Sequence, residues 1–151
     1  MSMFNAMNIS ASALTAQRLR MDVISQNIAN IQTTRTAEGG PYKRKTVIFE
    51  EVPDLDPFSA RLTDAIRRGQ KPTPQGMGVR VARVAEDDTP GILNYDPAHP
   101  DADEEGYVRM PNVNIIEEMV NMISASRSYE ANVTAINSTK AMIAKTLELG
   151  R

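Results

Sequence analysis

The single histidine of the chain, His99, lies in the acidic stretch YDPAHPDADEEG. An imidazole next to a carboxylate such as Asp101 could act as a general base or bind a metal ion. Pro97 and Pro100 flank His99, however, and indicate a loop. The sequence has no Ser-His-Asp spacing, Gly-rich phosphate loop or HExxH motif to complete a catalytic arrangement. We therefore expect no enzyme and no catalytic residue, and interpret His99 as a loop residue that serves shape or solubility.

The residues after the histidine resemble the first half of a calcium-binding loop. Carboxylates stand at its first, third and fifth positions and a glycine at its sixth: Asp101, Asp103, Glu105 and Gly106. Such a loop needs a bidentate glutamate at its twelfth position, where this sequence has Asn112. We therefore expect a solvated acidic turn, with no metal ligands and no cofactor-binding residues.

Charge is distributed unevenly along the middle of the chain. Residues 86–105 contain eight acidic residues and no Lys or Arg, whereas residues 61–83 contain six basic residues and one acidic residue, Asp64. Two interpretations remain open. The blocks are either two solvated faces, or they meet across a contact between subunits and set its register through complementary charge.

Composition excludes several classes of partner and chemistry. The chain has 151 residues, a formal charge of −2 and 41% hydrophobic residues, which fits one domain without the cationic surplus of a nucleic-acid-binding protein. It contains no Cys, which removes disulfides and thiolate chemistry. No apolar run is long enough to span a bilayer. No basic residue precedes Arg18, so we expect no cleaved secretory signal.

The glycines and prolines divide the chain into three parts. All nine prolines lie between Pro41 and Pro111, and seven of the eight glycines lie between Gly39 and Gly106. The flanking segments lack strong helix breakers. We therefore predict a mainly α protein with a small β region. Residues 1–34 and 112–151 would form one discontinuous helical coiled-coil domain, and residues 35–111 a small β-rich or looped middle.

The N-terminal part has the pattern of an amphipathic helix from Phe4 to Ile31. Its apolar side chains recur mostly at spacings of three, four or seven. Those predicted to pack against another helix are Leu14, Met21, Ile24 and Ile28.

The C-terminal part is more regular, with steps of four and three. The positions of this stripe are Ile115, Met119, Met122, Ser126, Tyr129, Val133, Ile136, Lys140, Ile143 and Leu147. Asn114 can cap the helix, and Glu117 stands three residues later, as in a capping box.

The middle predicts short strands at residues 45–52, around Val79 to Val84, and at residues 107–110. Between the first two strands we expect a connecting loop with one helical turn around Arg61 to Arg67.

Three arrangements could bury the two apolar stripes. The helices could pair within one chain, or lie on a membrane, although Arg127, Lys140 and Lys145 are the only basic residues between Asn112 and Gly150. Alternatively, they could form a coiled coil whose outer faces pack against other subunits. Flanking apolar residues and many alanines favour this third arrangement.

Two motifs resemble signatures of one protein family. SQNIANIQTTRT, with Asn27, Ala29, Asn30 and Thr33, resembles the N-terminal signature of bacterial flagellar axial proteins. EEMVNMISASRSYEAN resembles their C-terminal signature, through Glu118, Met119, Val120, Arg127, Tyr129, Glu130 and Asn132. The stretches EGGPYKRK and HPDADEEGYVRMPNVN, together with the short middle, are most similar to the basal-body rod members, in particular those of the proximal rod.

This resemblance implies a structural subunit that stacks helically with copies of itself and other rod proteins into a hollow drive shaft. The shaft would cross the periplasm and carry motor torque to the hook and filament. Implied partners are proximal and distal rod subunits, the rod-to-ring adaptor, the membrane-ring base and the flagellar type III export apparatus, which exports such chains without a cleaved signal. No cofactor, nucleic acid or membrane insertion is implied. The alternative is a soluble coiled-coil adaptor or export chaperone that binds one partner.

The resemblance also suggests roles for the motif residues. Asn27, Asn30 and Thr33 would bond neighbouring backbone where the first helix ends. Met119, Val120 and Ile123 would lie in the seam between the two helices. Arg127 and Glu130 would make contacts between helices or subunits, because a charged pair can set register, or would form a local solvated pair.

The terminal helices are expected to be weakly ordered in the isolated monomer, because a stripe without a partner gains too little to offset chain ordering. Far-ultraviolet circular dichroism and limited proteolysis of dilute protein measure this. Helix content should rise with protein concentration. Two terminal helices fully protected from protease in a monomer would contradict the expectation.

Overall fold

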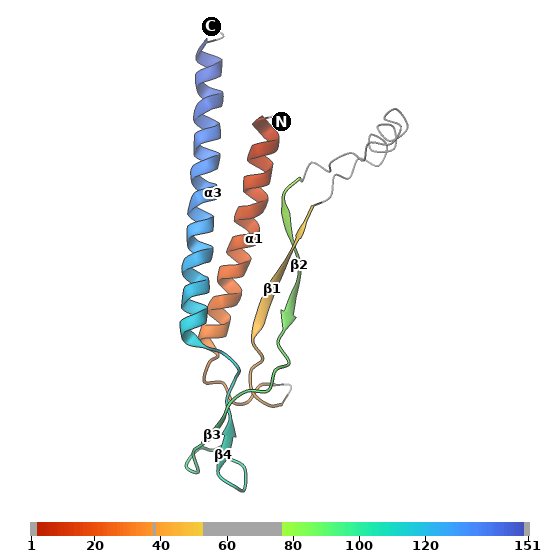
Figure 1. Cartoon of the computed structure of the whole chain (residues 1–151), viewed down its shortest axis with the longest axis vertical. Coiled ribbons are helices and arrows are strands. Elements are labelled where there is room, and N and C mark those ends of the chain that lie inside the picture. The colour runs from red at the N-terminus through yellow and green to blue at the C-terminus, as the bar shows by residue number, and fades with distance from the viewer. Residues whose placement is uncertain (1–2, 38, 53–76, 150–151) are drawn as a thin grey trace, which may run out of the picture.

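The computed structural model describes residues 3–37, 39–52 and 77–149. The elements are α1 (Met3–Ala29), β1 (Lys45–Glu51), β2 (Val79–Glu86), β3 (Leu93–Tyr95), β4 (Tyr107–Arg109) and α3 (Ile115–Leu149). The two helices lie side by side and antiparallel, the β1–β2 ribbon runs along α1, and the β3–β4 hairpin lies at one end of the molecule (Figure 1). The predicted mainly α fold with a small β region is confirmed. The helical turn expected around residues 61–67 lies outside the described residues.

The seam between α1 and α3 combines small, branched and polar side chains. The buried residues of the two helices are Ala16, Val23, Ile24 and Asn27 on α1, which packs against both α3 and the β1–β2 ribbon, and Glu118 and Ala125 on α3. Ala125, which is 0% exposed, faces α1, because α1 is the one described helix or strand that α3 contacts. Of the four residues predicted for α1, Ile24 is buried, and the other three (Leu14, Met21 and Ile28) are half-buried.

One prediction for α3 is wrong within the single chain. Met119, Val120 and Ile123 were expected in the seam, but they are 53%, 62% and 53% exposed. Successive helical residues are rotated by about 100°, and the seam is centred on Glu118 and Ala125. Val120 and Ile123 therefore lie on the far side of the helix, and Met119 lies at its flank. The regular apolar spacing did not show that a carboxylate would occupy the centre of the buried face.

The ends of the helices follow local hydrogen bonding. The Asn114 side-chain oxygen accepts a hydrogen bond from the Ile116 amide at 3.0 Å, which confirms the predicted N-cap. α1 ends at Ala29, two residues before the predicted end at Ile31. α3 is the longer helix, with 35 residues against 27, and its C-terminal end extends past the start of α1 (Figure 1).

The β1–β2 ribbon is antiparallel, and a bulge lies between Ile48 and Phe49. Its predicted strands are confirmed, with β1 one residue shorter than expected. At the start of β2, the Val79 amide donates a hydrogen bond to the Ser12 hydroxyl of α1 at 3.1 Å. Gly78, directly before it, has a φ of 126°, and a Cβ there would lie 2.4 Å from the same hydroxyl oxygen. This close approach of ribbon and helix requires glycine.

The β3–β4 hairpin contains one predicted strand and one that the sequence did not reveal. β4 lies within the strand predicted at residues 107–110, whereas β3 has three exposed residues and none that is β-branched. In the connecting loop, the Asp101 amide donates a hydrogen bond to His99 Nδ1 at 3.1 Å, so the histidine holds the shape of its own loop. No helix in the described ranges combines the length and apolar character that crossing a membrane requires.

Replacing Asn114 with alanine removes the cap of α3 and should lower the free energy of unfolding by about 1 kcal/mol. Urea denaturation followed by circular dichroism measures this, at a protein concentration at which both helices are formed. Asn137→Ala is the matched control, because Asn137 is exposed in the middle of the same helix. Equal losses for the two variants would show that the cap contributes nothing.

Candidate functional site

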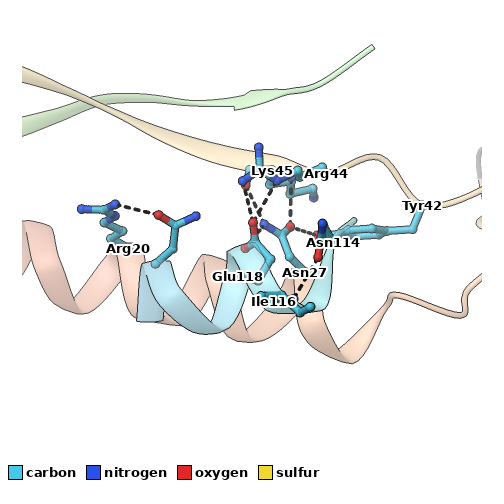
Figure 2. Close-up of polar contacts among 9 residues, drawn as sticks. Arg20, Asn27, Tyr42, Arg44, Lys45, Asn114, Ile116 and Glu118 are labelled. Carbon is cyan, nitrogen blue, oxygen red and sulfur yellow. Dashed lines mark hydrogen bonds and ion pairs between the residues drawn. The ribbon is translucent and has the colours of Figure 1, made fainter. Parts of the chain in front are cut away.

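The described residues contain no group of three or more His, Cys, Asp or Glu side chains arranged to hold a metal ion. The most connected polar site is instead a buried cluster where α1 ends, α3 begins and the chain enters β1. It consists of Asn27, Tyr42, Arg44, Lys45 and Glu118, and is called here the Asn27–Glu118 cluster (Figure 2).

Asn27 lies in the last turn of α1 and is only 1% exposed. Its amide nitrogen donates to the Lys45 carbonyl at 2.8 Å and to Glu118 Oε2 at 3.0 Å. Its amide oxygen accepts from the Lys45 amide at 2.9 Å and from the Tyr42 hydroxyl at 3.0 Å. Both polar groups of the Lys45 backbone are thus bonded as a neighbouring strand would bond them.

This arrangement corrects the role expected for Asn27. The sequence predicted a bond to neighbouring backbone at the helix exit, but the side chain reaches Lys45, which is 18 residues further along the chain. The reason is burial. A fully buried amide must satisfy two donors and two acceptor sites, and Lys45, the first residue of β1, supplies two of the four partners.

Glu118 lies in the first turn of α3 and is also 1% exposed. Its Oε1 atom accepts hydrogen bonds from Arg44 Nε at 2.9 Å and from Arg44 Nη2 at 2.6 Å, while Oε2 accepts from Asn27. Burying a carboxylate is costly unless charge and hydrogen bonds compensate it. Here a guanidinium and an amide supply both, so the three chain segments must come together for Glu118 to be buried.

Tyr42 completes the cluster from the loop before β1. Its hydroxyl must keep its proton to donate to Asn27, and the surroundings favour that form. Desolvation by burial raises the pKa of Tyr42 above 10.0, and the negative charges of Glu86 and Glu118 raise it further. The hydroxyl therefore remains a donor and fixes which way the Asn27 amide points.

The other N-terminal motif residues lie at the exit of α1. The Asn30 side chain donates to the Gln26 carbonyl at 2.8 Å, and the Thr33 hydroxyl donates to the Asn30 side-chain oxygen at 3.1 Å. The Thr33 carbonyl in turn accepts from the Tyr42 amide at 3.0 Å. These hydrogen bonds fix the path of the chain between the end of α1 and the Asn27–Glu118 cluster. Ala29 is exposed and makes no part of it.

The C-terminal motif residues are spread over two sides of α3. Tyr129 and Asn132 are half-buried, and the Asn132 side chain donates to the Ser128 carbonyl at 2.8 Å. Arg127 and Glu130 are exposed, and no salt bridge among the described residues includes either of them. Arg127 and Glu130 therefore do not form a local ion pair with each other. That each of them contacts another helix or subunit stays a prediction.

An apolar surface extends from the flank of α3 to the side that faces away from α1. Its residues, called here the outer face of α3, are Ile116, Met119, Val120 and Ile123, between 53% and 70% exposed. Apolar residues gathered at this helical spacing mark a surface that another helix can cover. The C-terminal motif thus contributes the buried Glu118 carboxylate to the cluster, while the apolar side chains next to Glu118 are exposed to solvent.

Sequence reasoning missed Tyr42 and Arg44. Both lie in PYKRK, where a basic run follows a pair of glycines. The sequence did carry a signal for such an ion pair: Glu117 and Glu118 make the first turn of α3 acidic, and a basic run elsewhere in the chain can pair with them. Which of the basic residues turns inward depends on the tertiary fold and could not be read from their order.

Glu118→Gln keeps the shape of the side chain but removes the buried charge that forms the salt bridge with the Arg44 guanidinium. Because Arg44 retains some solvent contact, we expect a loss of about 2 kcal/mol in the free energy of unfolding. Urea denaturation at matched concentration measures it. Glu117→Gln is the control, because Glu117 is exposed one residue earlier in the same turn. A loss no larger than that of the control would mean that the buried ion pair adds no stability.

Comparison with known proteins agrees with this geometry. The family model described as "Flagella basal body rod protein" matches residues 7–35, and "Flagellar basal body rod FlgEFG protein C-terminal" matches residues 104–149. These ranges include Asn27 and Glu118.

Curated relatives match along the whole chain. The flagellar basal-body rod protein FlgC of Borreliella burgdorferi is 49% identical, over 99% of this chain and 98% of its own length. FlgC of Bacillus subtilis is 48% identical and FlgC of Salmonella typhimurium strain LT2 is 40% identical, each over the full length of both chains. The chain therefore belongs to the FlgC family of flagellar basal-body rod proteins and is a structural subunit of the proximal rod, assembling with other rod components in the basal body.

Proposed function

We propose that the chain stacks helically with copies of itself and with other proximal and distal rod proteins into a hollow shaft that carries motor torque to the hook and filament. The outer face of α3 is the observation that carries this proposal. Four large apolar side chains on one helix face are left to solvent by the chain's own fold. Covering them with a neighbouring helix is favourable, because burial of apolar surface drives association.

In this proposal the two parts of the chain have different structural roles. Residues 1–34 and 112–151 form the helical unit that packs with neighbouring subunits, and residues 35–111 form a smaller β-containing unit. The Asn27–Glu118 cluster supports this division, because it joins the end of α1, the start of α3 and the entry to β1 by direct hydrogen bonds. A neighbour that contacts one unit is thereby held in a defined position relative to the other.

Membership of the family supports a proposal for the location and the remaining partners. We propose that the subunit leaves the cell through the flagellar type III export apparatus without a cleaved signal and takes its place in a rod that crosses the periplasm. There it would meet the rod-to-ring adaptor and the membrane-ring base. The cysteine-free sequence supports this route, since such a chain folds alike in reducing and oxidising surroundings. The role needs no catalytic group.

Val120→Gln combined with Ile123→Gln makes the outer face of α3 polar without touching the seam. Because both side chains are more than half exposed, the free energy of unfolding should change by less than about 0.5 kcal/mol for each substitution. In a flagellated strain that relies on this chain, the amount of the variant in purified basal bodies and the swimming radius should both fall strongly.

Ile48→Gln is the control for that experiment, since it makes the same kind of change on the ribbon, away from α3. It should leave rod assembly and swimming near the wild-type level. Normal assembly of the double variant would refute the role of the outer face.

A further inference from the structure

We propose that the open face of the β3–β4 hairpin binds the basic segment of a second copy of the chain, residues 61–83. This contact rests on the proposed assembly of copies into a rod, and adds to it a second, charge-matched surface away from the helices. The open face is defined by Leu93, Tyr95, Tyr107 and Arg109, together with the adjoining acidic residues 103–105.

The strand register places large side chains together on the open face. Leu93 pairs with Arg109, and Tyr95 pairs with Tyr107, so all four point to the same side. Leu93, Tyr95 and Tyr107 are 56%, 64% and 42% exposed, and the two tyrosine rings meet edge to face at 5.2 Å. Val108, on the opposite side, is buried. One side of the hairpin is thus packed, while the aromatic side is uncovered.

Nothing among the described helices and strands of the same chain covers this face. β3 and β4 contact each other and no other described element. The hairpin projects from the end of the molecule where α1 ends and α3 begins (Figure 1). A hollow of about 580 Å³ on it is lined by Leu93, Tyr107, Arg109 and the acidic residues 103–105. It has the mixture of apolar and charged groups found in protein interfaces.

The carboxylates of the hollow differ from the other acidic residues of the 86–105 block. Elsewhere in the block the side chains already have partners: Glu86 with Lys45, Asp87 with Thr89, Asp88 with Lys43, Asp96 with the Ala98 amide, and Asp101 with Thr34. The side chains of Asp103, Glu104 and Glu105 form no ion pair or hydrogen bond within the described ranges. With Arg109 beside them, they leave the hollow with a net charge of −2.

The chain's own basic segment provides the matching charge. Residues 61–83 contain six basic residues and one acidic residue. Of those that the structure describes, Arg80 pairs with Glu50, whereas Arg83 is exposed and forms no salt bridge in that part of the chain. A contact between two different surfaces of identical chains is heterologous, and it generates an open helical assembly, as a rod requires, when the rotation between copies does not close into a ring.

Charge reversal tests the contact. Glu104→Lys with Glu105→Lys reverses the charge of two residues in the hairpin hollow. Arg67→Glu with Arg68→Glu reverses the charge of two residues in the basic segment. Each double variant, expressed as the sole copy in a flagellated strain, should enter purified basal bodies at least about tenfold less than the wild type, because like charges oppose each other across the contact. Both pairs of changes in one chain should restore incorporation.

Co-expression of the two reversed variants separates a contact between copies from one within a copy. If the contact joins different copies, a lysine hairpin meets a glutamate segment, an unchanged hairpin meets an unchanged segment, and mixed rods form. If it lies within one copy, both variants remain mismatched and mixing restores nothing. Glu51→Lys, a charge reversal at an exposed residue of β1 that forms no salt bridge among the described residues, is the control and should assemble like the wild type.

The outcomes also separate this contact from the proposed function. Failure of the wild-type chain to enter basal bodies would overturn the proposed function itself. Entry of the wild type together with normal entry of both reversed variants would overturn only the hairpin contact. Reduced entry that neither the combined chain nor co-expression restores would overturn it as well, because the loss would then come from folding or from another partner. Rescue by both routes supports it.

Discussion

Burial of the Glu118 carboxylate is the constraint on which the rest of the fold depends. A charge that is 1% exposed requires a cation and further donors around it. Arg44 and Asn27 supply them from two segments distant in sequence. Asn27 then fixes Lys45 at the start of β1, and Tyr42 fixes the Asn27 amide. One carboxylate therefore determines where the helices meet and where the ribbon begins, and the apolar contacts fill the space between.

Features with a local cause could be predicted from the sequence. Both long helices, the Asn114 cap and most of the ribbon follow from spacing, capping chemistry and β-branched runs. The rotation of α3 about its axis could not be predicted in this way, because the apolar stripe and the buried face differ. The stripe passes through Met119, whereas the seam is centred on Glu118, whose burial depends on Arg44 from another segment. β3 was also missed, since Leu93–Tyr95 contains no β-branched residue and all three of its residues are exposed.

The same rotation connects folding to assembly. The rotation of α3 that buries Glu118 also exposes Val120 and Ile123. The polar cluster and the apolar outer face therefore both result from the same rotation of the helix. A seam with an apolar residue in place of Glu118 could bury more of the stripe inside the chain. It would then leave less surface for a neighbouring subunit. The buried ion pair thus supports a specific packing arrangement, whatever its net effect on stability.

The position of the Asn27–Glu118 cluster also has a mechanical consequence for a rotating shaft. Sliding α1 along α3 would have to break the bonds of Glu118 to Arg44 and Asn27 together and leave a bare charge in an apolar seam. Toward the opposite end of the helix pair, the helices carry half-buried apolar side chains such as Met7 and Ile136, and apolar contacts are less directional than these hydrogen bonds. Resistance to shear is therefore concentrated at the end next to the β elements, while the far end can yield slightly under torsion without losing the alignment of the subunit.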